Sequence, residues 1–203
     1  MNYVSDIMYW ISTGLLVPVV VLLIFFFGRS LLLIGSFFGQ YLAIRRTSTL
    51  ISKELEMLNR ENIHTLIEKL PQKNQSLVVI YMQRLLNAKD NIPLRQRLLS
   101  DFDIEAEKDL SVSKTLGKMG PMLGLMGTLI PMGPALVGLS AGDIASMAYN
   151  MQVAFATTVI GLFAAGIGYV TQSVKQRWYL QDLTNLEFVA GLLNENEKKN
   201  YEA

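Results

Sequence analysis

The fold is decided by LGKMGPMLGLMGTLIPMGPALVGL (residues 116–139) and NMQVAFATTVIGLFAAGIGYV (residues 150–170), two apolar stretches that follow each other closely. Each is long enough to cross a hydrocarbon core, which takes about 20 helical residues. Residues 115–174 contain only two charged side chains, Lys118 and Asp143, and Asp143 lies in the short Ser-Ala-Gly-Asp segment between the stretches. The sequence therefore predicts two membrane-spanning helices joined by a tight turn.

A third apolar stretch, residues 15–44, contains Arg29 as its only charged residue. Between this stretch and the other two, residues 45–114 hold twelve Lys or Arg and ten Asp or Glu, and the tail from residue 175 holds four and five. Apolar regions separated by a hydrophilic insert are typical of a membrane protein. We expect an all-α integral membrane protein with three transmembrane helices and a helical cytoplasmic domain.

The predicted segments follow in order along the chain. They are an external amphipathic segment (1–14), a first transmembrane helix (15–44), a cytoplasmic helical domain (45–115), a second transmembrane helix (116–139), a short external loop (140–149), a third transmembrane helix (150–174) and a cytoplasmic helical tail (175–203).

The orientation follows from where basic residues flank the spans, because Lys and Arg accumulate on the cytoplasmic side. They occur at Arg45, Arg46, Lys114, Lys118, Lys175 and Arg177, whereas the N-terminal segment and the loop at 139–148 have none. We expect a multi-pass protein of the cytoplasmic (inner) cell membrane, with its N-terminus outside and its C-terminus inside. A cleaved signal peptide is the alternative for the first span, but its leading residues include the acid Asp6 and no base, and the apolar stretch is longer than a signal core.

Apolar residues recur at helical spacing in the N-terminal segment and in the insert. Val4, Ile7, Met8 and Ile11 predict a short helix on the outer membrane surface that turns inward near Gly14. In the insert we expect one helix up to Pro71, a second over 76–88, and a third that starts near Leu94 and runs into the second span. The lone His64 lies in the first of these insert helices and is assigned no role.

Composition excludes several classes of function. A net charge of +1 argues against nucleic-acid binding, and zero Cys with one His exclude the common zinc and iron–sulfur ligand sets. No glycine-rich phosphate loop and no nucleophile elbow occur in the insert. We expect no cofactor, no metal and no enzymatic activity.

Small residues mark where the second and third spans pack on each other. Glycines at three- or four-residue spacing in the second span, and at seven-residue spacing in the third, permit close approach of two helices. The residues expected at this contact are Gly120, Gly124, Gly127, Gly161 and Gly168. Spans lined by such small side chains suit helix contacts better than lipid, which predicts a homo-oligomeric ring.

The polar residues of these spans are Thr128 in the second and Thr157 and Thr158 in the third. A threonine hydroxyl in a helix can simply bond the carbonyl one turn back. Alternatively, hydroxyls at similar depth on facing helices can line a hydrated path. Arg29 either extends its side chain to the cytoplasmic headgroups or pairs with a lipid phosphate between subunits, since a charge at mid-depth costs about 2.5–3.5 kcal/mol.

Two segments resemble a known family. PMLGLMGTL (121–129) resembles the APLLGLLGTV element of the MotA/TolQ/ExbB proton channel family, and AFATTVIGLFAAGIGY (154–169) resembles its third-span element ALxTTAxGLxxAIPAxxxYN. Gly142 and Asp143 in the external loop also match. The resemblance covers residues 110–178, and the remainder agrees in layout with the ExbB/TolQ arrangement.

The resemblance implies a pentamer whose second and third spans face a central pore. In that pore, two copies of a single-span partner (ExbD/TolR/MotB-like) hold an ion-binding aspartate, and ion flow moves the partner. By motif, Thr128 and Thr158 match the family's pore-lining threonines, with Thr157 next to the latter.

One position departs from the ExbB/TolQ pattern: Val153, beside Gln152, replaces a glutamate. A proton relay needs a titratable group in the membrane, and between residues 119 and 174 the only acid is Asp143 in the loop. A partner must therefore supply the acid. The sequence does not decide whether the transported ion is a proton or sodium. A non-conducting membrane scaffold is the alternative function.

Overall fold

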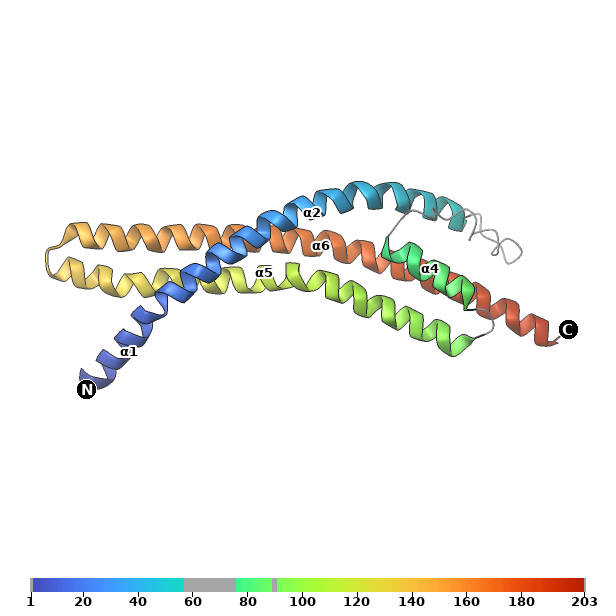
Figure 1. Ribbon diagram of the computed structural model, residues 1–203, viewed down its shortest axis with the longest axis horizontal. Helices are drawn as coiled ribbons and strands as arrows, with labels where there is room; N and C mark the ends of the chain where they lie inside the picture. The colour runs from blue at the N-terminus through green and yellow to red at the C-terminus, as the bar shows by residue number, and fades with distance from the viewer. Residues whose placement is uncertain (1, 57–75, 89–90, 203) are drawn as a thin grey trace. The chain divides into compact units, whose positions relative to one another are not determined.

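The computed structural model describes residues 2–56, 76–88 and 91–202, and within these the chain is helical with no strand. The helices are α1 (Asn2–Gly14), α2 (Leu16–Glu56), α4 (Leu77–Asn87), α5 (Ile92–Ser140) and α6 (Ile144–Glu202) (Figure 1). Three helical segments are long and apolar enough to cross a membrane: Ile7–Leu42, Ile92–Ser140 and Ile144–Asn194. The predicted all-helical fold with three membrane-spanning helices is confirmed, and ring formation remains a prediction.

The junction between α1 and α2 is nearly continuous. The turn expected near Gly14 is a one-residue interruption at Leu15, whose N–H donates to the carbonyls of Ile11 and Ser12 at 3.2 and 3.1 Å. The helical backbone resumes at once, because Val19 N–H donates to Leu15 O at 3.1 Å. Large apolar side chains along α1, such as Trp10, are exposed.

The described residues of Met1–Ser36 and Val112–Gln172 form the first of two compact units. In this unit α5 and α6 run antiparallel as a hairpin (Figure 1). α2 packs against the hairpin through Val19 and Leu23, which form a buried cluster with Leu123 and Ile130.

The hairpin turn is set by its backbone requirements. Gly142 has a φ of +74°, which only glycine adopts without strain. The N–H of Asp143 donates to Gly138 O at 2.8 Å and so satisfies a carbonyl at the end of α5. The Asp143 carboxylate then accepts the N–H of Ser146 at 3.0 Å, which caps the start of α6.

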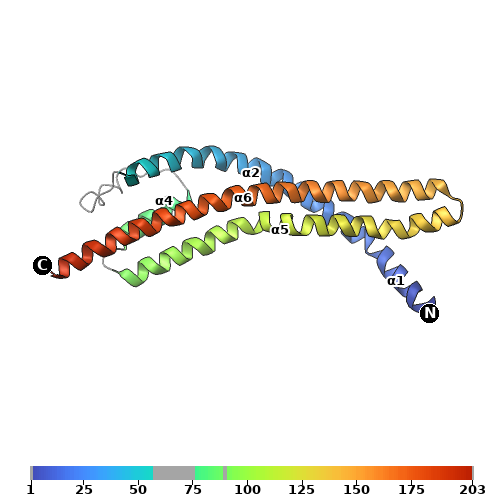
Figure 2. The ribbon, with the colours of Figure 1, turned by 180° about the vertical axis from the view of Figure 1, so that it is seen from behind.

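The described residues of Phe37–Ser111 and Ser173–Ala203 form the second unit. Its core joins α4 to the N-terminal part of α5 and the C-terminal part of α6 (Figure 2). Met82, Leu85, Phe102, Leu186 and Val189 are fully buried there. At the edge of this unit, Trp178 stacks on Phe37 with ring centroids 5.7 Å apart.

The insert helices can be compared with the prediction where they are described. α4 (Leu77–Asn87) lies within one residue of the segment expected at 76–88. Asn91 caps the next helix by accepting the N–H of Leu94 at 3.0 Å. α5 runs from there into the second span as one element, as the sequence predicted, and it contains Pro121, Pro131 and Pro134. Most of the insert helix expected before Pro71, with His64, lies outside the described residues.

Candidate functional site

The contact between α5 and α6 is close enough to exclude side chains at four glycines. A Cβ atom added to Gly161 would lie 2.6 Å from the carbonyl oxygen of Gly120. One added to Gly168 would lie 2.7 Å from the carbonyl oxygen of Ser113, and one added to Gly127 would lie 2.6 Å from Thr157 Oγ1. Cβ atoms do not occur at such distances, so these glycines support the packing role proposed for them.

Gly124 differs from the other glycines of the contact. A Cβ atom there would have its nearest neighbours at 3.6 Å, in Gly161 and Thr158, which is ordinary van der Waals contact. The position has room for a methyl group, so spacing alone does not separate the glycines that are required from those that are tolerant.

The three threonines occupy two different environments. Thr157 faces α5 against Gly127 and is only 5% exposed. Thr128 and Thr158 are half-buried in the monomer. The chain thus presents Thr128 and Thr158 at its surface, while Thr157 fills the contact between the helices.

Thr128 and Thr158 lie on the side of the hairpin that α2 leaves open. Successive helical residues are rotated by about 100°, so Thr128 and Thr158 are turned about 100° from Gly127 and Thr157, the residues that face each other. Ile130 and Ile160, three residues past Gly127 and Thr157, are turned about 60° the other way. Both pack with the cluster that joins α2 to the hairpin.

Because α5 and α6 are antiparallel, equal rotations place residues on the same side of the pair. α2 crosses one side of the hairpin, in front in Figure 1 and behind in Figure 2. By the rotations given above, both threonines lie on the other side. Three large apolar side chains stand three or four residues from these threonines and are exposed on their side: Leu125, Phe155 and Leu162.

Each hydroxyl group donates its proton to its own helix. Thr128 Oγ1 donates to Leu125 O at 2.7 Å, and Thr158 Oγ1 donates to Ala154 O at 3.2 Å. Thr157 Oγ1 lies 2.9 Å from Ala154 O and 3.1 Å from Val153 O. A hydroxyl whose proton is used in this way keeps its lone pairs, so the oxygen remains an acceptor for water or a cation.

Arg29 lies away from the turn of the hairpin, in the part of α2 that runs toward the second unit's end of the hairpin. Phe27, half a turn earlier, contacts Phe163 with ring centroids 5.7 Å apart, and Phe163 follows Gly161 by two residues. Arg29, two residues past Phe27, is therefore near the level at which Gly120 packs on Ala165. Its exposed guanidinium lies 5.9 Å from the ring of Phe25.

Acids are scarce around the hairpin. Asp143 is the only acidic residue between positions 119 and 174, and it caps α6 in the turn. Among the residues that the structure describes, no group of three or more His, Cys, Asp or Glu could hold a metal ion. The threonine oxygens are polar atoms that this chain presents on the open side.

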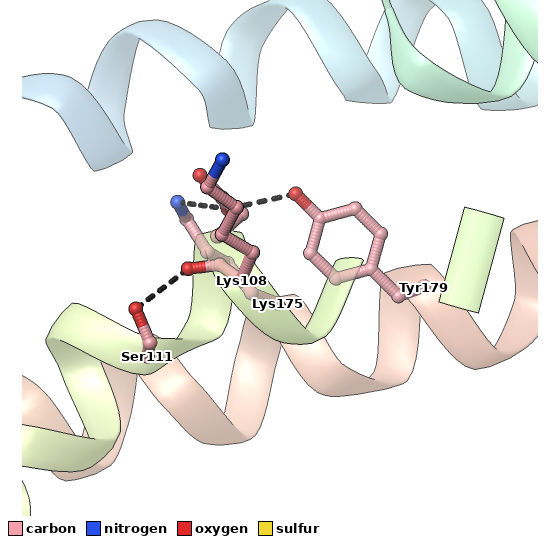
Figure 3. A network of polar contacts seen from close by, with 5 residues as sticks. Lys108, Ser111, Lys175 and Tyr179 are labelled. Atoms are coloured by element: carbon pink, nitrogen blue, oxygen red, sulfur yellow. Dashed lines mark hydrogen bonds and ion pairs between the residues drawn. The ribbon is translucent and has the colours of Figure 1, made fainter. Parts of the chain in front are cut away.

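Sequence reasoning missed a polar network in the second unit, shown in Figure 3. Lys175, nearly fully buried, donates to Asp109 Oδ2 at 2.8 Å, and the hydroxyl of Tyr179 donates to the same oxygen at 2.7 Å. Burial and the hydrogen bond to Asp109 raise the pKa of Tyr179, so this hydroxyl stays protonated. Along the chain, Asp109 is 66 positions from Lys175 and 70 positions from Tyr179, so no local sequence pattern predicts these contacts.

Comparison with known proteins identifies the family of the chain. A search of curated protein sequences found no match. The family model described as the MotA/TolQ/ExbB proton channel family matches residues 73–187, more than half of the chain. The match includes α4, the hairpin and all three threonines. The chain belongs to the MotA/TolQ/ExbB proton channel family.

Proposed function

We propose that this chain is the channel subunit of an ion-driven stator in the inner membrane. Membership of a channel and stator family, which is not an enzyme family, supports this role. In the proposed assembly, five copies form a ring around a dimer of a single-span ExbD/TolR/MotB-like partner. Ion flow along the interface between ring and partner turns or shifts the partner.

The observation that supports this proposal best is the common side of Thr128 and Thr158. Both hydroxyl oxygens lie on the side of the hairpin opposite to α2, and both keep acceptor lone pairs. With α2 outermost in the ring, this side faces inward. Leu125, Phe155 and Leu162 then form an apolar wall. Within this wall the hydroxyl oxygens are the groups that bind a permeating ion or its water.

The partner has to supply the titratable group. The inward side holds no carboxylate of this chain, and the position corresponding to the glutamate of ExbB and TolQ is Val153. An acid on the partner's span, opposite the threonines, would bind the ion, and the hydroxyl oxygens would accept a hydrogen bond from it or from water. The proposed ion is the proton.

The proposed orientation places the N-terminus outside and the charged second unit in the cytoplasm. Arg29 then reaches the cytoplasmic headgroup layer, where a lipid phosphate neutralises it. This avoids the cost of a charge at mid-membrane.

The experiment is ion flux into liposomes that contain the complex purified from its native membrane. Proton uptake is followed with a pH-sensitive dye and sodium uptake with a sodium indicator. Thr128→Val and Thr158→Val keep the shape of the side chain and remove the oxygen, and we expect flux to fall in both. Thr157→Val is the matched control, because Thr157 faces α5, and its flux should stay near the parent value.

A non-conducting scaffold is the second candidate, favoured by the bonds from all three hydroxyls to carbonyls of their own helix. Full flux in both Thr128→Val and Thr158→Val would mean that these hydroxyls serve only their helices. Absence of flux in the parent complex, with the partner present, would support the scaffold. Sodium uptake without proton uptake would show that the transported ion is sodium and not the proton.

A further inference from the structure

Three large apolar side chains in the charged part of α5 and α6 have close to half of their surface exposed or more. Ile104 is 64% exposed, Leu180 is 58% exposed and Phe188 is 47% exposed. Ile104 has the acids Asp103 and Glu105 as chain neighbours, which places it in a water-facing stretch. A single exposed apolar side chain is ordinary on a protein surface. These three, however, lie at related levels along the helix pair and point away from the core.

Their levels along the helix pair follow from two contacts in the second unit. Asp109 of α5 bonds Lys175 and Tyr179 of α6, and Arg95 of α5 donates to Asn194 of α6. Interpolating between these contacts along antiparallel helices puts Ile104 level with about residue 183. Ile104 is therefore level with the interval between Leu180 and Phe188.

The directions of the side chains also fit. Ile104 is two residues from Phe102 and from Ala106, which are buried in the core, so it points away from that core. On α6, Leu180, Thr184 and Phe188 recur every four residues on an exposed face. The Thr184 hydroxyl donates to Leu180 O at 2.9 Å. A small side chain with a satisfied hydroxyl thus stands between two large apolar ones.

We propose that Ile104 of one copy of this chain inserts between Leu180 and Phe188 of the next copy. This rests on the ring of the proposed function and names its contact in the second unit. A side chain that packs over residues four apart on a facing helix is the geometry of knobs-into-holes packing. The two surfaces differ, so the contact is heterologous. Ile104 and the two residues that receive it lie at the same level along the helix pair. Copies related by rotation about an axis parallel to the helices therefore meet without a shift along that axis, so the ring can close.

An opposite-charge pair at one end of the contact agrees with a second copy as the occupant. By the same interpolation, Arg177 of one copy is near the level of Glu107 of the next. Both halves of the contact are on this chain at one level, and no other partner is needed to complete them.

The chain has no cysteine, so disulfide crosslinking in native membranes tests the contact directly. The double variants Ile104→Cys with Leu180→Cys, and Ile104→Cys with Phe188→Cys, should form ladders of covalent oligomers up to the ring size under mild oxidation. The matched control pairs Gln96→Cys with Leu180→Cys; both positions are exposed but they lie at different levels, so no ladder should form. Native mass spectrometry checks that each variant assembles as the parent does.

The outcomes separate this inference from the proposed function. Intact rings in which neither Ile104 pair crosslinks would overturn the contact and leave the stator proposal standing. Crosslinked dimers in the single variant Ile104→Cys would replace it by a contact between identical surfaces. A parent that is monomeric in mild detergent would overturn both the ring and this contact.

Discussion

At the scale of single residues, the buried Lys175 depends on the carboxylate of Asp109. The buried Lys175 ammonium is 2.8 Å from Asp109 Oδ2, and Asp109 also accepts the hydroxyl of Tyr179. A buried cation without a counter-charge is costly, whereas an apolar replacement of both partners is often neutral. The network therefore ties α5 to α6 through charge as well as shape.

This gives a prediction for Asp109. Asp109→Asn leaves Lys175 buried without its counter-charge, and we expect it to lower the free energy of unfolding by about 3 kcal/mol. The double variant with Lys175→Met should recover most of that loss. The measurement is thermal inactivation of the detergent-solubilised protein, scored by the fraction that remains monodisperse after heating.

The control is an ion pair at the surface. Arg97 and Asp101 are 3.7 Å apart with side chains 78% and 45% exposed, and such pairs contribute about 0.5 kcal/mol. Arg97→Ala should therefore shift the inactivation curve little. A similar shift for Arg97→Ala and Asp109→Asn would refute a special role for the bond between Asp109 and the buried Lys175.

At the scale of elements, the approach of α5 to α6 is limited by backbone and not by side chains. A methyl group on Gly161 would meet Gly120 O at 2.6 Å and Gly124 Cα at 2.9 Å, and neither backbone atom can move without separating the helices. The same methyl group on Gly124 would meet nothing closer than 3.6 Å.

Gly161→Ala and Gly124→Ala should therefore behave differently. We expect Gly161→Ala to cost about 1–3 kcal/mol through overpacking. Gly124→Ala should be neutral or gain up to about 1 kcal/mol, because alanine favours helix over glycine. Thermal inactivation of the two variants side by side is the measurement. Equal loss in both would mean that another surface, such as a neighbouring subunit, also packs on Gly124.

The same elements separate what sequence can predict from what it cannot. Length and apolar content predict the spans, and the break at Asn91 and Pro93 with the turn at Gly142 predicts where α5 begins and ends, because these signals are local. Which glycine touches the facing helix depends on how each helix is rotated, and spacing in the sequence does not give that rotation. Gly124 and Gly127 therefore look alike in the sequence, although only Gly127 is in tight contact. The link from Asp109 to Lys175 joins residues 66 positions apart, and only the fold brings them together.

At the scale of the whole molecule, the distribution of charge determines how the chain sits in the membrane. Basic residues flank the spans at Arg45, Arg46, Lys114, Lys118, Lys175 and Arg177, whereas Ser140–Asp143 has none. Insertion leaves Lys and Arg on the cytoplasmic side. The second unit and the hairpin turn should therefore lie on opposite sides of the membrane.

The absence of cysteine makes this orientation testable with single thiols. Ala141→Cys in the hairpin turn and Tyr3→Cys in α1 should react with a membrane-impermeant maleimide in intact cells, because both exposed positions should face outward. Ser100→Cys and Gln181→Cys, also exposed, should react only after the membrane is permeabilised. Labelling of Ser100→Cys in intact cells with protection of Ala141→Cys would invert the chain, and the partner's acid would then have to reach the threonines from the opposite side.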